Sequence, residues 1–226
     1  LIPEEHVTRC MQHFKATGYE HLPIIIGADI ARYGDDQTVL FVRQGRKQLE
    51  VKKYRGLSTI EASERISEMI QKWDSRHVFV DGVGLGAGVV DYLIEKKGYK
   101  FVVDVQSGGS PDNDKKYHNK RDEMWVRMAK IIEQGFELIE DTEMYEELVS
   151  VEYGYTMNDK LKIESVKDMK ARGLASPDTA TAFALTLAYN VNLRQNDNNN
   201  GITRSQENTS VSMQKKRILR SGSLKR

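Results

Sequence analysis

The chain has 226 residues, with 34 Lys and Arg against 33 Asp and Glu, so its formal net charge at pH 7 is +1. This length can bury a full hydrophobic core, and the balanced charge gives no overall signature of nucleic-acid binding. The single cysteine, Cys10, excludes a disulfide framework and a zinc site built from cysteines. No apolar run approaches the roughly 20 residues that span a bilayer, and no signal peptide is visible.

The first part of the chain reads as a lead-in segment followed by three strands. Apolar residues at helical spacing predict a short helix within a linker at residues 1–20, and the start at Leu1 rather than Met indicates a piece of a longer protein. Residues 24–42 have the pattern of two strands around a Gly-Asp turn, and residues 48–54 that of a third strand. Sequential strands joined by short turns are predicted to be antiparallel.

The middle of the chain alternates helices and strands. Residues 58–73 are predicted as a helix, because Ser58 or its neighbour caps it and Glu61 is placed for a capping box. Residues 77–81 read as a buried strand, followed by a glycine-rich turn, a helix and a strand at 99–105. The change from antiparallel strands to strand–helix–strand units predicts an α/β fold, a mixed sheet flanked by helices.

The last third is predicted to be mainly helical. Its expected elements are a loop at 106–118, helices at 119–135 and 141–151, and a strand at 160–165. A further helix starts in Ser176-Pro177-Asp178 and ends near residue 192, since serine is a preferred cap and proline suits the first helical position. The domain is therefore expected over residues 21–192, followed by a disordered basic tail at 193–226, either a solvated linker or a docking segment.

Three aspartates occupy similar structural positions in these elements. Asp29 interrupts the apolar run of the first strand, Asp81 ends the strand at 77–81, and Asp178 opens the last large helix. If the first and fourth strands are neighbours, their carboxylates converge at one end of the sheet. Three oxygen ligands without histidine or cysteine suit Mg²⁺ or Mn²⁺, and two such ions about 3.5–4 Å apart promote phosphodiester hydrolysis.

Each aspartate also has a simpler explanation. An ionised carboxylate in a core strand costs several kcal/mol unless a cation satisfies it, and an arginine such as Arg32 or Arg121 could pair with Asp29. Asp81 could be a turn residue, and Asp178 could stabilise a helix N-terminus through the helix dipole. A shared cation accounts for all three positions together, so we favour it over three separate explanations.

A second motif competes for the same stretch. Residues 82–88 satisfy G-x-G-x-x-A, and Asp104 lies twenty residues after Gly84, which is the spacing of a dinucleotide-binding fingerprint. Two features argue against that interpretation. Asp81, directly before the first glycine, would repel a pyrophosphate, and three antiparallel strands upstream do not belong to a doubly wound nucleotide-binding fold.

Several short motifs also follow one another with a characteristic spacing. They are Gly27-Ala28-Asp29, Gly34-Asp35-Asp36-x-Thr38, Val80-Asp81-Gly82, Asn119-Lys120-Arg121-Asp122-Glu123-Met124-Trp125, Lys170-x-Arg172-Gly173 and Ser176-Pro177-Asp178-x-Ala180. Together they resemble the C-terminal nuclease domain of the large terminase subunit of tailed phages, over residues 1 to about 192. The opening segment resembles the connection from that domain to the family's N-terminal packaging ATPase, which is absent from this chain.

The resemblance implies an RNase H-like fold and a metal-dependent endonuclease that cuts concatemeric double-stranded DNA during packaging in the host cytoplasm. Asp29, Asp81 and Asp178 match the family's acidic triad, which implies two bound Mg²⁺ or Mn²⁺ ions. The implied partners are double-stranded DNA, the phage portal protein through residues 193–226, and the small terminase subunit. No membrane partner is expected.

The resemblance also implies roles for basic residues. Lys170 is a candidate for contacting DNA or the scissile phosphate. Asn119, Lys120 and Arg121 match a helix start that faces the cleft in such folds, although a solvated basic turn explains them equally well.

One position departs from the family pattern, because Thr181 stands where many members have a second acid. The second ion is therefore expected to be held weakly, and Asp35 or Asp36 could contribute, although a turn role suits both better. Two other functions remain open. One is a different RNase H-like nuclease, such as a junction resolvase or a transposase, and the other is a non-catalytic docking module of the packaging motor.

Overall fold

The structure is a computed structural model that describes residues 1–31 and 36–191. Arg32, the predicted turn at 34–35 and the predicted tail at 193–226 lie outside the described residues. Within those that are described, no helix is long and apolar enough to cross a bilayer.

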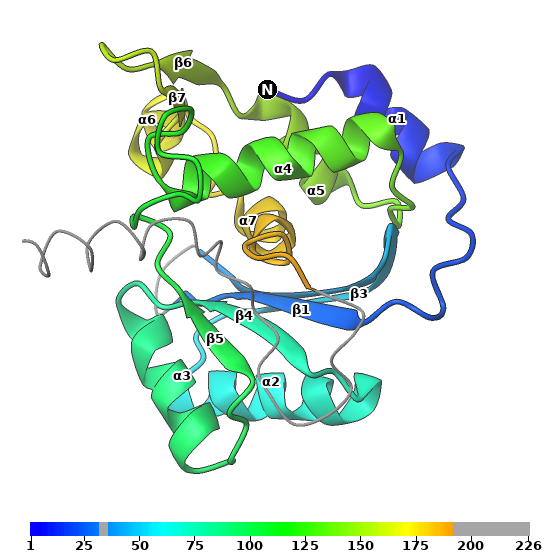
Figure 1. Cartoon of the computed structure of the whole chain (residues 1–226), viewed down its shortest axis with the longest axis vertical. Coiled ribbons are helices and arrows are strands. Elements are labelled where there is room, and N and C mark those ends of the chain that lie inside the picture. Colours follow the sequence, from blue (N-terminus) through cyan, green and yellow to red (C-terminus); the bar gives the residue numbers. More distant parts are fainter. Residues whose placement is uncertain (32–35, 192–226) are drawn as a thin grey trace, which may run out of the picture.

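A five-stranded mixed sheet forms the centre of the molecule (Figure 1). Its strands are β1 (Ile24–Asp29), β2 (Thr38–Gln44), β3 (Lys47–Tyr54), β4 (His77–Asp81) and β5 (Val102–Val105), in the order β3-β2-β1-β4-β5. Strands β1, β2 and β3 pair in antiparallel fashion, whereas β4 is parallel to both β1 and β5. The short connections force the antiparallel pairing, and the long crossovers allow the parallel one. The predicted mixed sheet is confirmed.

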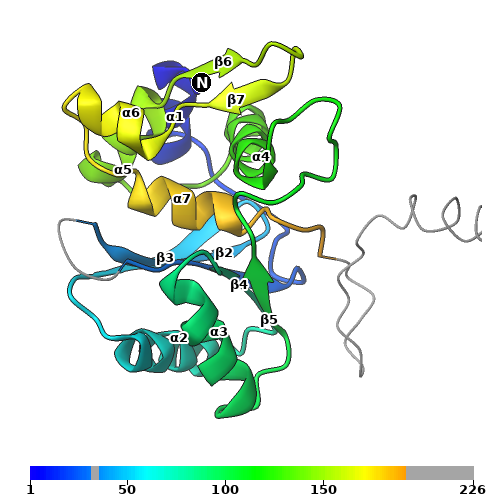
Figure 2. The same ribbon diagram turned by 90° about the vertical axis from the view of Figure 1, so that its left-hand side faces the viewer.

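Helices cover both faces of this sheet (Figure 2). The helices are α1 (Glu4–Gln12), α2 (Thr59–Trp73), α3 (Leu85–Glu95), α4 (Lys120–Gln134), α5 (Thr142–Ser150), α6 (Val166–Ala171) and α7 (Asp178–Leu185). Figure 2 shows α2 and α3 on one face, and α7 on the other between the sheet and the outer helices α4 and α5. A separate hairpin of β6 (Tyr153–Tyr155) and β7 (Leu161–Ile163) lies beyond α4.

Alternation along the strands supplies an apolar core to each face. On β1, Ile25 packs with α4 and α7, whereas Ile26 packs with α2 and α3. Helix α7 approaches β1 very closely, because a Cβ atom at Gly27 would stand 2.1 Å from the carbonyl oxygen of Ala182. Glycine at this position therefore lets α7 lie directly on the sheet.

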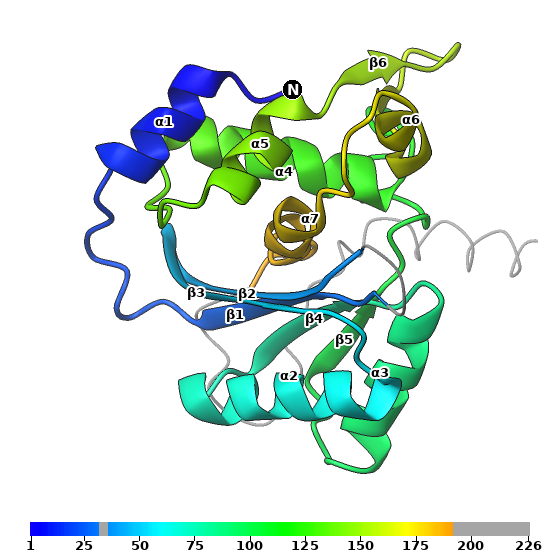
Figure 3. The same cartoon turned by 180° about the vertical axis from the view of Figure 1, so that it is seen from behind.

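The lead-in segment carries α1, which packs outside α4 and α5 (Figure 3). Val7 and Cys10 are fully buried in the same core as α4. The Cys10 thiol donates to the carbonyl oxygen of Ile132 at 3.3 Å. Helix α1 thus contributes apolar surface to the domain.

The predicted helix starts are largely confirmed. The Ser58 and Glu61 capping box begins α2, and Asn119 forms a second capping box with Asp122 at the start of α4. Asp141 caps α5 by accepting the backbone N–H of Met144 at 3.0 Å. These caps are local hydrogen bonds within three residues, which explains why the sequence reveals them.

Several boundaries differ from the predictions. Strand β5 begins at Val102, whereas the prediction began it at residue 99. Residues 99–101 instead form a turn, in which the Val102 N–H donates to the carbonyl of Tyr99 at 3.0 Å. Helical spacing predicts Ile60 on the apolar side of α2 together with Ile66 and Ile70, but Ile60 is 58% exposed. Strand β6 and helix α6 were not predicted, since a three-residue strand and a six-residue helix are too short for a periodic signal.

The start and the end of α7 also differ from the prediction. Its N-cap is Pro177, which has no side-chain cap, so Ser176 is not the cap and proline is not the first helical residue. The helix ends at Leu185 rather than near residue 192. Arg43 explains the early end, because its guanidinium donates to the carbonyl oxygen of Thr186 at 2.8 Å and so satisfies a carbonyl that the helix leaves open.

Candidate metal centre

Two parallel strands bring Asp29 and Asp81 to the same end of the sheet. The register between β1 and β4 pairs Ala28 with Val80, so the two aspartates come next on adjacent strands. Asp178 is the first residue of α7, which contacts both strands. The carboxylates act on one another electrostatically, since the charges of Asp178 and Asp81 both raise the pKa of Asp29. The topology thus places the three predicted acids in one region.

Asp29 is the least satisfied of the three. Burial raises its pKa well above the usual value, and the charges of Asp178, Asp81, Glu147 and Asp36 raise it further. No hydrogen-bond donor from the described ranges reaches its carboxylate. A carboxylate with this environment is poorly compatible with a negative charge unless a cation lies beside it.

Asp81 is held by two local donors. The Ser107 hydroxyl donates to its Oδ2 at 2.8 Å, and the Val83 N–H donates to its Oδ1 at 3.2 Å. Burial nevertheless raises the pKa of Asp81, because it outweighs these hydrogen bonds. Gly86 permits this arrangement, since a Cβ there would stand 1.6 Å from the Asp81 carbonyl oxygen. The glycine run therefore allows α3 to begin against Asp81, which is a packing role.

Asp178 is 6% exposed and accepts the backbone N–H of Gln37 at 2.6 Å. Gln37 directly precedes β2, so this bond joins the start of α7 to the hairpin strand. Burial raises the pKa of Asp178, against the lowering effect of its hydrogen bonds from Ser176 and Gln37.

The three carboxylates are near one another without converging on a single point. In residues 1–31 and 36–191, no group of three His, Cys, Asp or Glu side chains lies close enough together to hold one ion. Two of the three carboxylates have hydrogen-bond donors of their own, Ser107 for Asp81 and Gln37 for Asp178. The donor set itself fits Mg²⁺ or Mn²⁺, since it consists of carboxylate oxygens whose negative charges disfavour one another.

Arg121 does not neutralise Asp29 directly. Its Nη1 donates to the carbonyl of Glu164 at 2.9 Å, and its Nη2 is buried without a hydrogen-bond partner in the described part of the chain. Burial lowers the pKa of Arg121, and the charges of Asp29 and Asp81 are among those that raise it. Arg121 forms no ion pair within 4.0 Å with any Asp or Glu of the described residues. It is therefore not the arginine partner that the sequence allowed for Asp29.

The other basic candidates have definite positions. Lys170, on α6, is exposed and its ammonium lies 2.8 Å from Oδ1 of Asp36. Lys120 is 2% exposed and pairs with Asp112 at 3.0 Å and with Glu123 at 2.9 Å. Lys120 is therefore not part of a solvated basic turn, and its ammonium is engaged by two carboxylates. Asn119 uses its side chain to cap α4.

Sequence reasoning missed one residue of this region, Glu147. It lies on α5, is 8% exposed, and accepts the Ala180 N–H at 2.7 Å through Oε2. Burial raises the pKa of Glu147 to about 8, and the charge of Asp178 contributes. The available signal was periodicity, because Glu147 lies between the buried Met144 and Leu148 on the inner face of α5.

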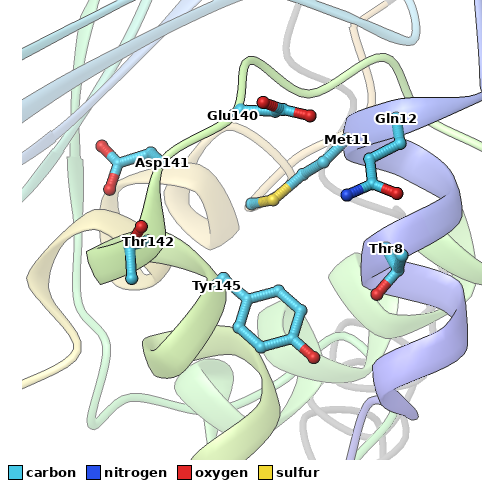
Figure 4. A pocket seen from close by; sticks show the side chains of 7 residues that line it. All are labelled: Thr8, Met11, Gln12, Glu140, Asp141, Thr142 and Tyr145. Carbon is cyan, nitrogen blue, oxygen red and sulfur yellow. The ribbon is translucent and has the colours of Figure 1, made fainter.

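A small cavity of about 240 Å³ lies elsewhere, between α1 and the start of α5 (Figure 4). Its lining residues are Thr8, Met11, Gln12, Glu140, Asp141, Thr142 and Tyr145. The carboxylate of Asp141 is already engaged by the ammonium of Lys53 at 2.9 Å and by the cap of α5. This cavity contains none of the three candidate metal ligands.

The fold resembles solved nuclease structures. No family model matches the chain, and no curated protein matches its sequence. The nuclease domain of the large terminase subunit gp2 of bacterial virus Sf6 is similar with a TM-score of 0.67 and 17% identity, over 82% of this chain and 97% of that one. The large terminase nuclease of thermophilic phage G20c, with bound magnesium, has a TM-score of 0.60 and 15% identity, over 80% and 93% of the two chains. The nuclease domain of Thermus phage P74-26 has a TM-score of 0.57 and 13% identity, over 80% and 90%.

At these identities the likeness shows the fold, and the chain has an RNase H-like α/β fold. The antiparallel β1–β3 portion is incompatible with a doubly wound dinucleotide-binding sheet.

Proposed function

We propose that this chain is the nuclease domain of a phage large terminase subunit, a divalent-metal-dependent endonuclease that cuts concatemeric double-stranded DNA. The observation that carries the proposal is the placement of Asp29, Asp81 and Asp178 at one end of the β1–β4 pair. The similar structure from phage G20c holds magnesium, and one of the Sf6 domain holds manganese, which supports the choice of cation.

In the proposed mechanism, Asp29, Asp81 and Asp178 would hold two Mg²⁺ or Mn²⁺ ions. When bound, such ions supply an activated water and stabilise the leaving 3′ oxygen of the phosphodiester. Asp29 has no competing donor from the described residues, so it is the ligand most available to a cation. The Ser107 hydroxyl and the Gln37 amide orient Asp81 and Asp178. Lys170 is proposed to contact the DNA, from its exposed position on α6.

The test is plasmid cleavage in Mn²⁺ by Asp29→Asn. We expect cleavage to be lost while the circular dichroism spectrum is unchanged, because Asn keeps the shape and removes the charge. Asp91→Asn on α3 is the matched control, since Asp91 is an exposed aspartate outside this region, and it should cleave normally. Undiminished cleavage by Asp29→Asn would refute the proposal.

A substrate panel addresses the neighbouring nuclease functions. Preference for linear duplex over branched and RNA–DNA duplexes is expected, whereas a strong preference for branched DNA would point to a resolvase-type enzyme. The proposal also includes the host cytoplasm as the place of action, the portal protein as a partner of residues 193–226, and the small terminase subunit as a second partner.

A second candidate function is a docking module whose acids no longer bind metal. The observation in its favour is that no three acids of the described chain converge on one point. Calorimetric titration with Mn²⁺ separates the two candidates. Saturable binding that Asp29→Asn abolishes supports the nuclease, and no binding at millimolar Mn²⁺ supports the docking module.

A further inference from the structure

Arg43, on β2, is a buried cation without an acidic partner. It is 9% exposed, and its guanidinium donates to the hydroxyl of Thr186 at 2.7 Å, to the carbonyl of Thr186 at 2.8 Å and to the carbonyl of Gly45 at 2.9 Å. All three acceptors are neutral, and no Asp or Glu in the described ranges forms an ion pair with it. A buried charge without a counter-ion is costly, and burial accordingly lowers the pKa of Arg43 to about 10.

Arg43 lines a cavity of about 510 Å³ that contains other cations. Arg46 and Lys130 are exposed and line it, and Arg127 completes the basic part of the wall. The floor includes the apolar Ile25 from β1. None of the residues that line the cavity is Asp or Glu. We call this space the basic cavity.

Most of its positive charge is uncompensated. Arg127 is neutralised outside the cavity, by Asp112 at 2.8 Å and Glu123 at 3.2 Å. Arg46 reaches only the neutral Gln134, with its Nη2 donating to Oε1 at 3.0 Å. Lys130 has no ion pair with the described acids. Three cations, Arg43, Arg46 and Lys130, therefore line one space that has no acid among its lining residues.

The basic cavity is separate from the candidate metal centre. It is lined by Ile25, near the start of β1, whereas Asp29 is the last residue of that strand. The chain that follows the last lining residue, Val191, has eight Lys and Arg and only two acids in its sequence, so it is a poor source of counter-charge.

We propose that the basic cavity binds a phosphate group. Guanidinium groups donate paired N–H bonds that match phosphate oxygens, and a nearby ammonium adds a point charge. Three of the five N–H donors of Arg43 are used, which leaves two for a ligand. The phosphate can belong to a DNA backbone or to a free phosphate or nucleotide, and the volume is within the range of small-molecule sites.

The experiment is calorimetric titration of the full chain in EDTA with inorganic phosphate, and separately with a short DNA duplex. The test variant is the double substitution Arg46→Gln/Lys130→Gln, and the matched control is Arg76→Gln/Lys96→Gln, two exposed cations on the other side of the sheet. We expect about tenfold weaker phosphate binding in the test variant, about 1.4 kcal/mol, and no change in the control.

The outcomes are distinct. Equal phosphate affinity in the test and control variants, or no phosphate binding by the unsubstituted chain, overturns the proposal. Loss of duplex binding along with phosphate binding identifies a DNA backbone as the source, and an unchanged duplex affinity identifies a free phosphate or nucleotide. Arg43→Met provides a further check, and the surface double variant keeps the test valid if Arg43→Met fails to fold. Because metal is absent, the result does not depend on nuclease activity.

Discussion

The backbone N–H of Ala180 donates to Oε2 of Glu147 at 2.7 Å, so a carboxyl group on α5 caps the helix that begins with Asp178. Pro177, at the N-cap position, has no side chain that could do this. An open N–H at a helix start favours an acceptor of this kind. Glu147 therefore anchors the element that carries one of the candidate metal ligands.

The first prediction concerns the pH dependence of stability through Glu147. Its pKa is about 8 in the folded protein and near 4.5 in the unfolded chain. The contribution of Glu147 to the free energy of unfolding is thus fully present below about pH 4.5 and is lost as the pH rises towards 8. Over this range the free energy of unfolding falls by up to about 1.4 kcal/mol per pH unit. Urea unfolding over this range should show a flatter profile for Glu147→Gln.

The control for that experiment is Glu146→Gln, which replaces the exposed neighbouring glutamate. It should keep the pH profile of the unsubstituted chain. Asp29, Asp81 and Asp178 also have raised pKa values, so a residual slope of the same sign remains in Glu147→Gln. Superimposable profiles of Glu147→Gln and the unsubstituted chain would contradict the assigned environment.

The second prediction concerns the stability of Asp29→Asn. In EDTA near neutral pH, this substitution should raise the free energy of unfolding by about 1 kcal/mol or more, because it removes a charge that burial and neighbouring acids disfavour. Adding Mn²⁺ should reverse the order of stability. The unsubstituted chain gains about 2.7 kcal/mol at a hundredfold excess over the dissociation constant, whereas the variant gains little.

Thermal or urea unfolding with and without Mn²⁺ provides the measurement, with Asp91→Asn as the control. A stabilisation by Mn²⁺ that is equal in Asp29→Asn and in the unsubstituted chain would show that the ion binds elsewhere.

The third prediction concerns the contact between α7 and β1. Gly27→Ala should destabilise the protein by about 3 kcal/mol or more, because the added Cβ would meet the backbone carbonyl of Ala182 at 2.1 Å. Gly154→Ala is the matched control, since no atom lies within 4 Å of the Cβ position there, and its effect should stay below about 1 kcal/mol. Equal urea midpoints for the two variants would be inconsistent with this packing.

The fourth prediction concerns Lys120. Lys120→Met should destabilise the protein by about 1.5–3 kcal/mol, because the buried Glu123 loses its ammonium partner and keeps only the guanidinium of Arg127 at 3.2 Å. Lys96→Met, at an exposed site, should change stability by less than about 0.5 kcal/mol. Under conditions where the Lys120 variant is folded, its DNA affinity should match that of the unsubstituted chain. A normal stability combined with weaker DNA binding would restore the role predicted from the sequence.

Features that depend on neighbouring residues were determined by the sequence alone. The caps at Ser58 and Asp141 are hydrogen bonds within three residues, and the antiparallel strands follow from their short connections. Asp81 at the end of its apolar strand was equally visible, whereas Asp29 was expected inside its strand and is the last residue of β1 in the structure. Their adjacency then follows from the pairing of β1 with β4.

Only the tertiary structure decided the features that join distant segments. Lys120 looks like a surface residue in the sequence, but Asp112 and Glu123 meet its ammonium in the interior. Arg43 ends α7 by binding Thr186, which lies 143 residues later in the chain. Burial and pairing of this kind depend on which elements pack together, and no local pattern of residues encodes that.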